Sequence, residues 1–435
     1  MIKDKNMNIL LIGSGGREHA IVKALKKSPM CGRIYALPGN GGIAEDAECV
    51  PISATDIEGI VGFAKTHPID FAAVIPDDPL AMGLTDRLRE MGIPCFGPTR
   101  RAAVIESSKA FSKELMKKYG IPTAAYGTFT DCDKAIAYAR TQRLPIVIKA
   151  DGLALGKGVI IAESYDGAEN AIREMMLNGR FGKSGECVVI EEFLTGPEVS
   201  VLTFTDGKTV VPMPASMDHK RIGDGDIGLN TGGMGAIAPN PYYTEEMQRR
   251  TMEEIILPTI AAMNEENRTF KGCLYFGLML TSDGPKVIEY NCRFGDPETQ
   301  AVLPLMNSDL LEIMLAVENG TLSECRVEFL NACSCCLVLA SGGYPENYEK
   351  GQEITMGHFP GNISVFHAGT KRDGEKLLTN GGRVLGITAV AESLEDAVGA
   401  SYEAAKSIGF DGVYYRHDIG KRALKALKED CRHGG

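Results

Sequence analysis

The chain has 435 residues, a length that suggests roughly three domains. Its hydrophobic fraction of 44% and charged fraction of 24% are ordinary globular values and exclude a disordered chain. The 57 acidic and 46 basic side chains give a net charge of −11, which argues against a general nucleic-acid binder because a phosphate backbone requires a basic surface. An anionic ligand would need a local cluster of cations and backbone amides.

The apolar runs are too short for membrane or export signals. None approaches the roughly 18 residues of a membrane helix, and Ile9–Ile12 is too short for a signal peptide. We therefore expect a cytoplasmic protein whose 12 cysteines are reduced. Cys333, Cys335 and Cys336 lie in an apolar run, which is more typical of a buried strand than of a metal site.

The first hundred residues alternate between short apolar strands and helical stretches. We predict strands at 8–13, 33–37, 71–75 and 94–97, and helices at 18–27, 56–67 and 79–91. This alternation indicates a parallel sheet, in which ligands bind at the carboxyl ends of the strands.

From about residue 107 the pattern changes to antiparallel units. We predict a helix at 108–119, hairpins at 145–164 and 199–213, a helix at 244–263 and strands at 274–281 and 285–290. A polar, glycine-rich loop is expected at about 216–240. The last hundred residues are expected to form a third unit of the α+β class, with a helix at 394–407.

Two glycine-rich turns follow the first two strands. In GSGGREHA (13–20) the glycines would let an anion approach the N-terminus of a helix. Glu18 stands where the dinucleotide fingerprint requires glycine, and ALPGNGG (36–42) ends the second strand without the acid that binds an NAD ribose. A phosphate or sugar phosphate fits better than NAD, and tight strand–helix packing is the alternative.

Two further segments indicate a nucleotide. KADGLALGKGV (149–159) joins two strands without the spacing of a P-loop, and we interpret it as a flap over phosphates with Lys149 as a fixed cation. In EEFLTGPE (191–198), the backbone of Glu192–Leu194 could bind an adenine edge and Glu198 a ribose. A surface hairpin and solvated carboxylates are the respective alternatives.

VIEYN (287–291) indicates a metal site. In a regular strand Glu289 and Asn291 share a face with Val287, and two oxygen ligands on one face suit Mg²⁺ beside phosphates. Arg293 follows at once, and Asp296 with Pro297 is expected to cap the next helix. The loop DHKRIGDGDIGLNTGGMGA (218–236) could position a carboxylate or phosphate, or it could be a solvated excursion.

Taken together and in chain order, these motifs resemble one family. With GPT…SKAF (97–111), RFGDPETQ (293–300), HAGTK (367–371) and TNGGRVLGIT (379–388), the chain is similar to phosphoribosylamine–glycine ligases, or glycinamide ribonucleotide synthetases, of the ATP-grasp superfamily. The resemblance implies a fold of the α/β and α+β classes. It has a parallel-sheet preATP-grasp domain (1–106), an ATP-grasp module (107–324) with a small lobe inserted at about 123–193, and a small C-terminal α+β domain (325–435).

The resemblance also implies a reaction. ATP would phosphorylate glycine, and 5-phosphoribosylamine would attack the glycyl phosphate, giving glycinamide ribonucleotide, ADP and phosphate in de novo purine biosynthesis. Its partners would be these small molecules, with no nucleic acid or membrane, and the protein would be a monomer or small homo-oligomer.

Matching motifs assign roles to individual residues. The ATP-binding residues would be Lys109, Lys149, Gly156, Lys157, Glu191, Glu192, Phe193, Leu194 and Glu198. The cofactor Mg²⁺ or Mn²⁺ would be held by Glu289 and Asn291. The catalytic residues would be Arg293, Asp218 and Lys220. The residues facing phosphoribosylamine would be Gly15, Gly16, Arg17, Asn40, Asp77 and Arg383.

The segment VIPDDPL (74–80) departs from the family pattern. Ile75 replaces a glycine and Asp77 replaces a glutamate, so the phosphoribosylamine site is where this chain departs from its family. This departure favours one alternative, another ATP-grasp ligase or carboxylase acting on a related amine or carboxylate. A nucleotide-binding regulator without catalysis would be expected to lack Glu289, Asn291, Arg293 or Lys149, and a nicotinamide oxidoreductase would need the missing third glycine and ribose acid.

Overall fold

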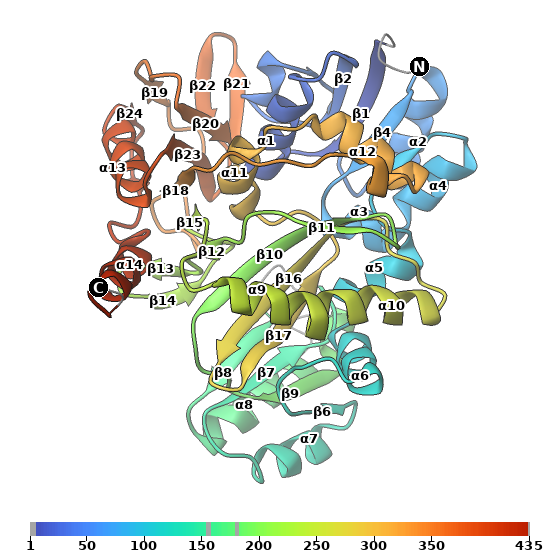
Figure 1. Cartoon of the computed structure of the whole chain (residues 1–435), viewed down its shortest axis with the longest axis vertical. Helices are drawn as coiled ribbons and strands as arrows, with labels where there is room; N and C mark the ends of the chain where they lie inside the picture. Colours follow the sequence, from blue (N-terminus) through green and yellow to red (C-terminus); the bar gives the residue numbers. More distant parts are fainter. Residues whose placement is uncertain (1–5, 154–157, 179–181, 434–435) are drawn as a thin grey trace.

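The computed structural model of the chain describes residues 6–153, 158–178 and 182–433 (Figure 1). Its N-terminal unit contains a five-stranded sheet in the order β3-β2-β1-β4-β5. The predicted parallel arrangement is confirmed for four strands, whereas the short β3 was not predicted. The strands are β1 (Met7–Gly13), β2 (Cys31–Pro38), β3 (Glu48–Cys49), β4 (Phe71–Val74) and β5 (Cys95–Phe96). The apolar β1 lies at the centre and is almost wholly buried, as is typical of parallel sheets.

The helices of this unit follow the strands. They are α1 (Gly16–Leu25), α2 (Ile57–Thr66), α3 (Asp77–Met82), α4 (Leu84–Glu90) and α5 (Arg100–Ser107). The prediction of one helix at 79–91 is wrong, because Gly83 adopts a φ of +88° and ends α3 in the left-handed conformation. The short α3 begins directly behind β4, so Asp77 lies at the carboxyl end of the sheet.

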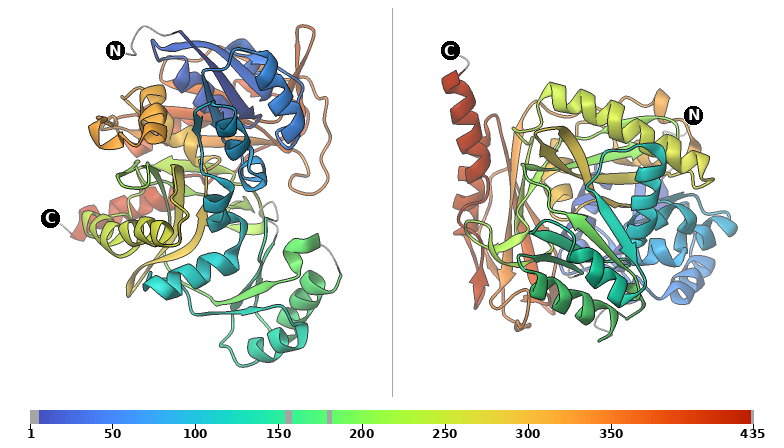
Figure 2. Two further views of the ribbon diagram at one scale, coloured as in Figure 1. Left: turned by 90° about the vertical axis from the view of Figure 1, so that its right-hand side faces the viewer. Right: turned by 90° about the horizontal axis from the view of Figure 1, so that it is seen from below.

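The small lobe is a four-stranded antiparallel sheet in the order β6-β9-β7-β8. Its elements are β6 (Tyr126–Phe129), α7 (Cys132–Ala139), β7 (Ile146–Ala150), β8 (Val159–Ala162), α8 (Tyr165–Met176) and β9 (Val188–Glu192). It forms one end of the molecule (Figures 1 and 2) and has a hydrophobic cluster of its own. The predicted hairpin of β7 and β8 is confirmed, with Lys149 paired to Val159.

The larger lobe beside it is a second antiparallel sheet, in the order β11-β10-β16-β17. Its elements are α6 (Lys109–Tyr119), β10 (Glu198–Thr205), β11 (Val210–Pro212), α9 (Glu245–Thr251), a π-helical stretch (Met252–Ile256), α10 (Leu257–Glu265), β16 (Gly272–Thr281) and β17 (Gly284–Asn291). One hydrophobic cluster joins β1 to β16, so this lobe and the N-terminal unit pack as one body.

A bulge in β17 overturns one expectation. Gly277 pairs with Glu289 while Leu278 pairs with Val287, so Ile288 is an extra residue in the ladder. The alternation therefore shifts, and Val287 packs in the same hydrophobic cluster as Tyr290 rather than sharing the face of Glu289. The bulge leaves Glu289 and Asn291 on one face, as predicted.

The expected loop at 216–240 is also different in the structure. It contains β12 (Met217–Asp218), β13 (Arg221–Gly223), β14 (Ile227–Asn230) and β15 (Gly235–Ala238). The strands β12 and β15 join the sheet of the C-terminal unit in the order β12-β15-β18-β23-β20, to which β25 also pairs. This sheet therefore combines two distant parts of the chain.

The remaining elements complete the C-terminal part of the chain. They are α11 (Glu298–Val302), α12 (Leu310–Asn319), β18 (Cys333–Ser341), β19 (Thr355–Met356), β20 (Ile363–His367), β21 (Thr370–Asp373), β22 (Lys376–Thr379), β23 (Arg383–Ala391), α13 (Leu394–Ala405), β24 (Ile408–Gly409), β25 (Val413–Tyr414) and α14 (Lys421–His433). The cysteine cluster lies in the strand β18, as expected. Within the described residues, no helix is both long enough and apolar enough to cross a membrane.

Candidate active site

A cavity of about 1500 Å³ lies where the two lobes, the N-terminal unit and the C-terminal segments meet. Most residues assigned from the motifs line it: Arg17, Asp77, Lys109, Lys149, Glu191, Glu192, Phe193, Leu194, Glu198, Asp218, Lys220, Glu289, Asn291, Arg293 and Arg383. Gly156 and Lys157 lie outside the described residues. Gly15, Gly16 and Asn40 are described but are not among the lining residues.

Glu289 and Asn291 line the cavity from the end of β17. Although burial raises the pKa of Glu289, the positive charges of Lys220 and Lys149 lower it below the ordinary value. The carboxylate is thus held in its charged form among cations. Two oxygen donors suit a hard divalent cation that takes its other ligands from phosphates and water.

A buried carboxylate and a backbone carbonyl fix the lysine at the end of β7. The Nζ atom of Lys149 lies 3.0 Å from a carboxylate oxygen of Glu191 and donates to the carbonyl of Ile288 at 3.0 Å. The other oxygen of Glu191 pairs with Lys113 at 3.1 Å. Burial lowers the pKa of Lys113 to about 8 despite this partner. The Glu191 side chain, which the resemblance assigns to ATP binding, therefore holds two lysines.

Lys113 was missed by the sequence reasoning, although a signal existed. It stands four residues after Lys109 on α6, and residues at this spacing share a helix face. Lys109 donates to the carbonyl of Gly152 at 3.0 Å, which links α6 to the start of the glycine-rich segment. Burial lowers the pKa of Lys109, as expected for an ammonium removed from water.

The polar loop brings a further lysine, Lys220, to the predicted metal-ligand pair. The Nζ atom of Lys220 lies 2.9 Å from Glu198 and 3.8 Å from Glu289. Burial alone would lower the pKa of Lys220, but these two carboxylates raise it well above the ordinary value. Glu198, expected near a ribose, therefore also positions a cation.

Asp218 is the most deeply placed carboxyl of this loop. Its Oδ1 atom is buried and has no hydrogen-bond partner within the described residues. Burial, together with the charge of Glu298, raises the pKa of Asp218 well above its ordinary value. A Cβ atom at Gly233, where φ is +108°, would lie 2.6 Å from Oδ1, so the return of the loop needs glycine there.

Arg293 is fixed by a glutamate that the sequence reasoning did not identify. Glu106 accepts from Arg293 at 2.9 Å through one oxygen and from the backbone N–H of Cys292 at 2.7 Å through the other. The Nε atom of Arg293 is buried and has no partner within the described residues. A buried donor without an acceptor is costly unless a ligand supplies one, which fits an anion at this point.

The side of the cavity toward the N-terminal unit carries two more arginines. Arg17 donates to the carbonyl of Phe294 at 2.9 Å, and Arg383 pairs with Asp296 at 3.2 Å. Burial raises the pKa of Asp77, but the positive charges of Arg293 and Arg17 outweigh this effect. The pKa of Asp77 therefore lies below its ordinary value.

Asp296 is not the cap that the sequence predicted. The helix α11 begins at Glu298, and Pro297 is the residue before it. Instead Asp296 accepts from Gln300 at 2.6 Å and pairs with Arg383. Asp296 therefore pairs with Arg383 instead of capping α11, and this ion pair connects the start of β23 to the cavity.

Polar groups in both glycine-rich turns form hydrogen bonds with other parts of the protein. Glu18 accepts from the N–H of Gly15 at 2.6 Å and so caps α1. The side-chain amide of Asn40 donates to the carbonyls of Ser14 and His367, at 2.8 and 2.7 Å. These contacts join the first two strand ends to the C-terminal unit.

Two lobes around a cavity with carboxylate, amide and lysine side chains define a protein of the ATP-grasp class. Residues 107–299 match the family model described as "Phosphoribosylglycinamide synthetase, ATP-grasp (A) domain". Residues 7–106 and 334–422 match the models of the N domain and C domain of the same synthetase. The chain therefore belongs to the phosphoribosylglycinamide synthetase family.

Relatives and solved structures agree with this membership. A phosphoribosylamine–glycine ligase of Vibrio vulnificus is 49% identical over 424 residues, which cover 96% of this chain and 99% of the relative. A relative of the same name from Rhizobium meliloti is 48% identical, with the same coverage of both chains. The crystal structure of the Thermotoga maritima phosphoribosylamine–glycine ligase superposes with a TM-score of 0.84 at 35% identity, covering 95% of this chain and all of that chain.

A more distant structure shares only the fold. It is a biotin carboxylase domain from Hydrogenobacter thermophilus in complex with MgADP, which is 19% identical and superposes with a TM-score of 0.72. The two superposed parts cover 99% of this chain and 95% of that one.

Proposed function

We propose that this chain joins glycine to 5-phosphoribosylamine in an ATP-dependent ligase reaction of purine biosynthesis. The observation that carries the proposal is one cavity that contains a predicted metal-ligand pair, Arg293 and the lysines Lys109, Lys113, Lys149 and Lys220, with Arg17 and Arg383 in the same lining. The names of the near-full-length relatives support this choice of substrates.

The proposed reaction has two steps. A carboxylate oxygen of glycine attacks the γ-phosphorus of ATP, and ADP leaves. The amine of phosphoribosylamine then attacks the acyl carbon, and phosphate leaves with that oxygen. Lys109 and Lys149 would neutralise the phosphate oxygens, and the unpartnered Nε of Arg293 would donate to the acyl phosphate.

Glu289 and Asn291 would hold Mg²⁺ or Mn²⁺. The charged form of Glu289 and the shared face of both side chains fit such an ion. When bound, the metal would neutralise charge on the transferred phosphoryl group and orient it. Lys220, between Glu198 and Glu289, would lie beside the glycine carboxylate together with Asp218.

The remaining ligand contacts stay predictions. The backbone of Glu192–Leu194 would receive adenine, and Arg17, Asp77 and Arg383 would face phosphoribosylamine. Gly15, Gly16 and Asn40, which are not among the lining residues, stay predicted to face phosphoribosylamine. We further propose that the protein works in the cytoplasm, where its thiols stay reduced.

Phosphate release measured with each substrate omitted in turn tests the reaction. We expect release from ATP only when glycine and phosphoribosylamine are both present. Glycine labelled with oxygen-18 in its carboxylate should transfer one labelled oxygen to the released phosphate. Turnover indifferent to either substrate, or unlabelled phosphate, would contradict the proposal. Replacing glycine with other amino acids tests the alternative of a related ligase.

A further inference from the structure

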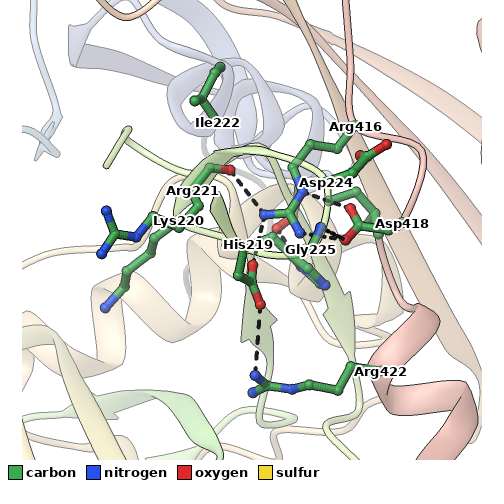
Figure 3. Close-up of polar contacts among 12 residues, drawn as sticks. His219, Lys220, Arg221, Ile222, Asp224, Gly225, Arg416, Asp418 and Arg422 are labelled. Atoms are coloured by element: carbon green, nitrogen blue, oxygen red, sulfur yellow. Dashed lines mark hydrogen bonds and ion pairs between the residues drawn. The ribbon is translucent and has the colours of Figure 1, made fainter. Parts of the chain in front are cut away.

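The hairpin of β13 and β14 belongs in sequence to the larger lobe but is held by the C-terminal segment 414–422. The hairpin directly follows Lys220, so its position decides where that lysine lies. Figure 3 shows the two segments facing each other, with Arg416 between the hairpin and Asp418. The contacts join residues nearly two hundred positions apart in the chain.

Arg416 is the centre of this contact. It is only 1% exposed, and all three of its guanidinium nitrogens are engaged. Nη1 donates to the carbonyl of Arg221 and to Asp226, both at 2.9 Å. Nε and Nη2 each donate to Asp418 at 2.8 Å. Bidentate pairing of this kind fixes direction as well as distance.

The neighbours of Arg416 hold the turn of the hairpin. Asp418 also accepts from the N–H of Gly225 at 2.8 Å, and Asp224 accepts from the N–H of His417 at 2.7 Å. The hydroxyl of Tyr414 donates to the carbonyl of Ile222 at 2.8 Å.

His219 supplies the matching tether on the other side of Lys220. Its Nε2 atom accepts from the N–H of Gly420 at 3.3 Å, and its Nδ1 lies 3.2 Å from the carbonyl of Gly235. Nε2 must therefore be the unprotonated nitrogen. Burial and the charge of Arg416 lower the pKa of His219 to about 4, which keeps this neutral form at neutral pH. The residues before and after Lys220 are thus both bound to the C-terminal segment.

We propose that Arg416 is a positioning residue of the active site, acting through the backbone of Arg221 to hold Lys220 between Glu198 and Glu289. The inference rests on the proposed function for the role of Lys220. Arg416 is among the residues that line the cavity, but four of its five N–H donors are bound to protein acceptors, so we infer that its effect is transmitted through the backbone rather than exerted on the substrate.

Steady-state kinetics of Arg416→Lys and Arg416→Met provide the test. Lysine keeps the charge but cannot pair with Asp418 and Arg221 together. We expect kcat/KM for glycine to fall roughly 10-fold in Arg416→Lys and further in Arg416→Met, because small displacements of a reacting group cost this much. The KM for ATP should change by less than about threefold.

Arg89→Met is the matched control. Arg89, like Arg416, is bidentate to a carboxylate, pairing with Glu318 at 2.8 and 2.9 Å; it is partly buried and lies outside the cavity. It should lose stability while keeping both kinetic constants. Equal kinetic losses in Arg89→Met and Arg416→Met, or a wild-type kcat/KM for glycine in folded Arg416→Lys, would overturn the proposal.

Hydrogen exchange separates this inference from the proposed reaction. Backbone amides at 219–231 should exchange at least about tenfold faster in Arg416→Lys than in the unaltered chain, with no change around Arg89. Unchanged exchange would overturn the tether. If the unaltered chain fails to ligate glycine, the proposed function fails, and the exchange experiment still reports on the tether.

Discussion

At the scale of single residues, four cations of the cavity are paired with carboxylates. Glu191 holds Lys113 and Lys149, Glu106 holds Arg293, and Glu198 holds Lys220. Pairing keeps charged groups tolerable where water is scarce. It also explains how a protein with a net charge of −11 can gather cations around anionic ligands.

Glu289→Gln should remove the negative charge of a predicted metal ligand without changing the shape of the side chain. We expect kcat for phosphate release to fall at least about 100-fold, with a higher Mg²⁺ requirement, because the ligand loses its charge. Titration of Mg²⁺ or Mn²⁺ against phosphate release checks this. Glu353→Gln, which alters an exposed glutamate paired with Lys376, is the control and should be neutral. Full activity in Glu289→Gln would remove this residue from the metal site.

The sequence could predict the residues that carry local signals. Glu289, Asn291 and Arg293 stand in one short segment, and the structure brings them to one cavity. Glu106 and Arg416 could not be predicted this way, because their partners are distant in the chain. Their roles become visible only when the fold buries them beside those partners.

At the scale of elements, two strands or helices differ from their predicted form because a single residue changes the local backbone conformation. The bulge at Ile288 shifts the alternation of β17, and no propensity in VIEYN indicates an extra residue. Gly83 divides a helix, and here the signal was present, since an isolated glycine near a helix end favours a left-handed cap. The strands β12 and β15 were missed because both are short; β12 pairs with β15, and β15 in turn pairs with the distant strand β18.

Substituting two helix-region glycines should change stability in opposite directions. Gly83→Ala meets only ordinary contacts but keeps a φ of +88°, so it should cost about 1 kcal/mol. Gly62→Ala, in the interior of α2 with open space around it, should stabilise by up to about 1 kcal/mol. Urea unfolding of both variants measures the free energies. Equal signs would show that the φ angle at Gly83 does not decide the outcome.

At the scale of the whole molecule, the N-terminal and C-terminal units meet through buried histidines. The Nδ1 atom of His19 accepts from the backbone N–H of His367 at 2.8 Å, and both rings are almost fully buried. Burial, then the charge of Arg372, lowers the pKa of His367 to about 4, and burial lowers that of His19 well below its ordinary value.

These depressed values predict acid sensitivity with a definite sign. The unfolded chain takes up protons near pH 6.5 and the folded one only near pH 4, so stability is full above the first value and falls between the two. At about pH 5.5 the loss should be on the order of 1 kcal/mol for His367. His367→Gln should show a smaller drop in melting temperature between about pH 7.5 and about pH 5.5. An identical drop in both proteins would assign the acid sensitivity to other groups.

The sheet that β12 and β15 share with the C-terminal strands limits how this protein can evolve by recombination. Strands from the larger lobe complete the C-terminal sheet, so a recombination event that transferred residues 325–435 alone would leave β18 without its neighbour β15. The exposed ladder would favour association with foreign strands. The unit can therefore be exchanged between proteins only together with the segment that bears Asp218 and Lys220, so this part of the scaffold and its chemistry are inherited as one.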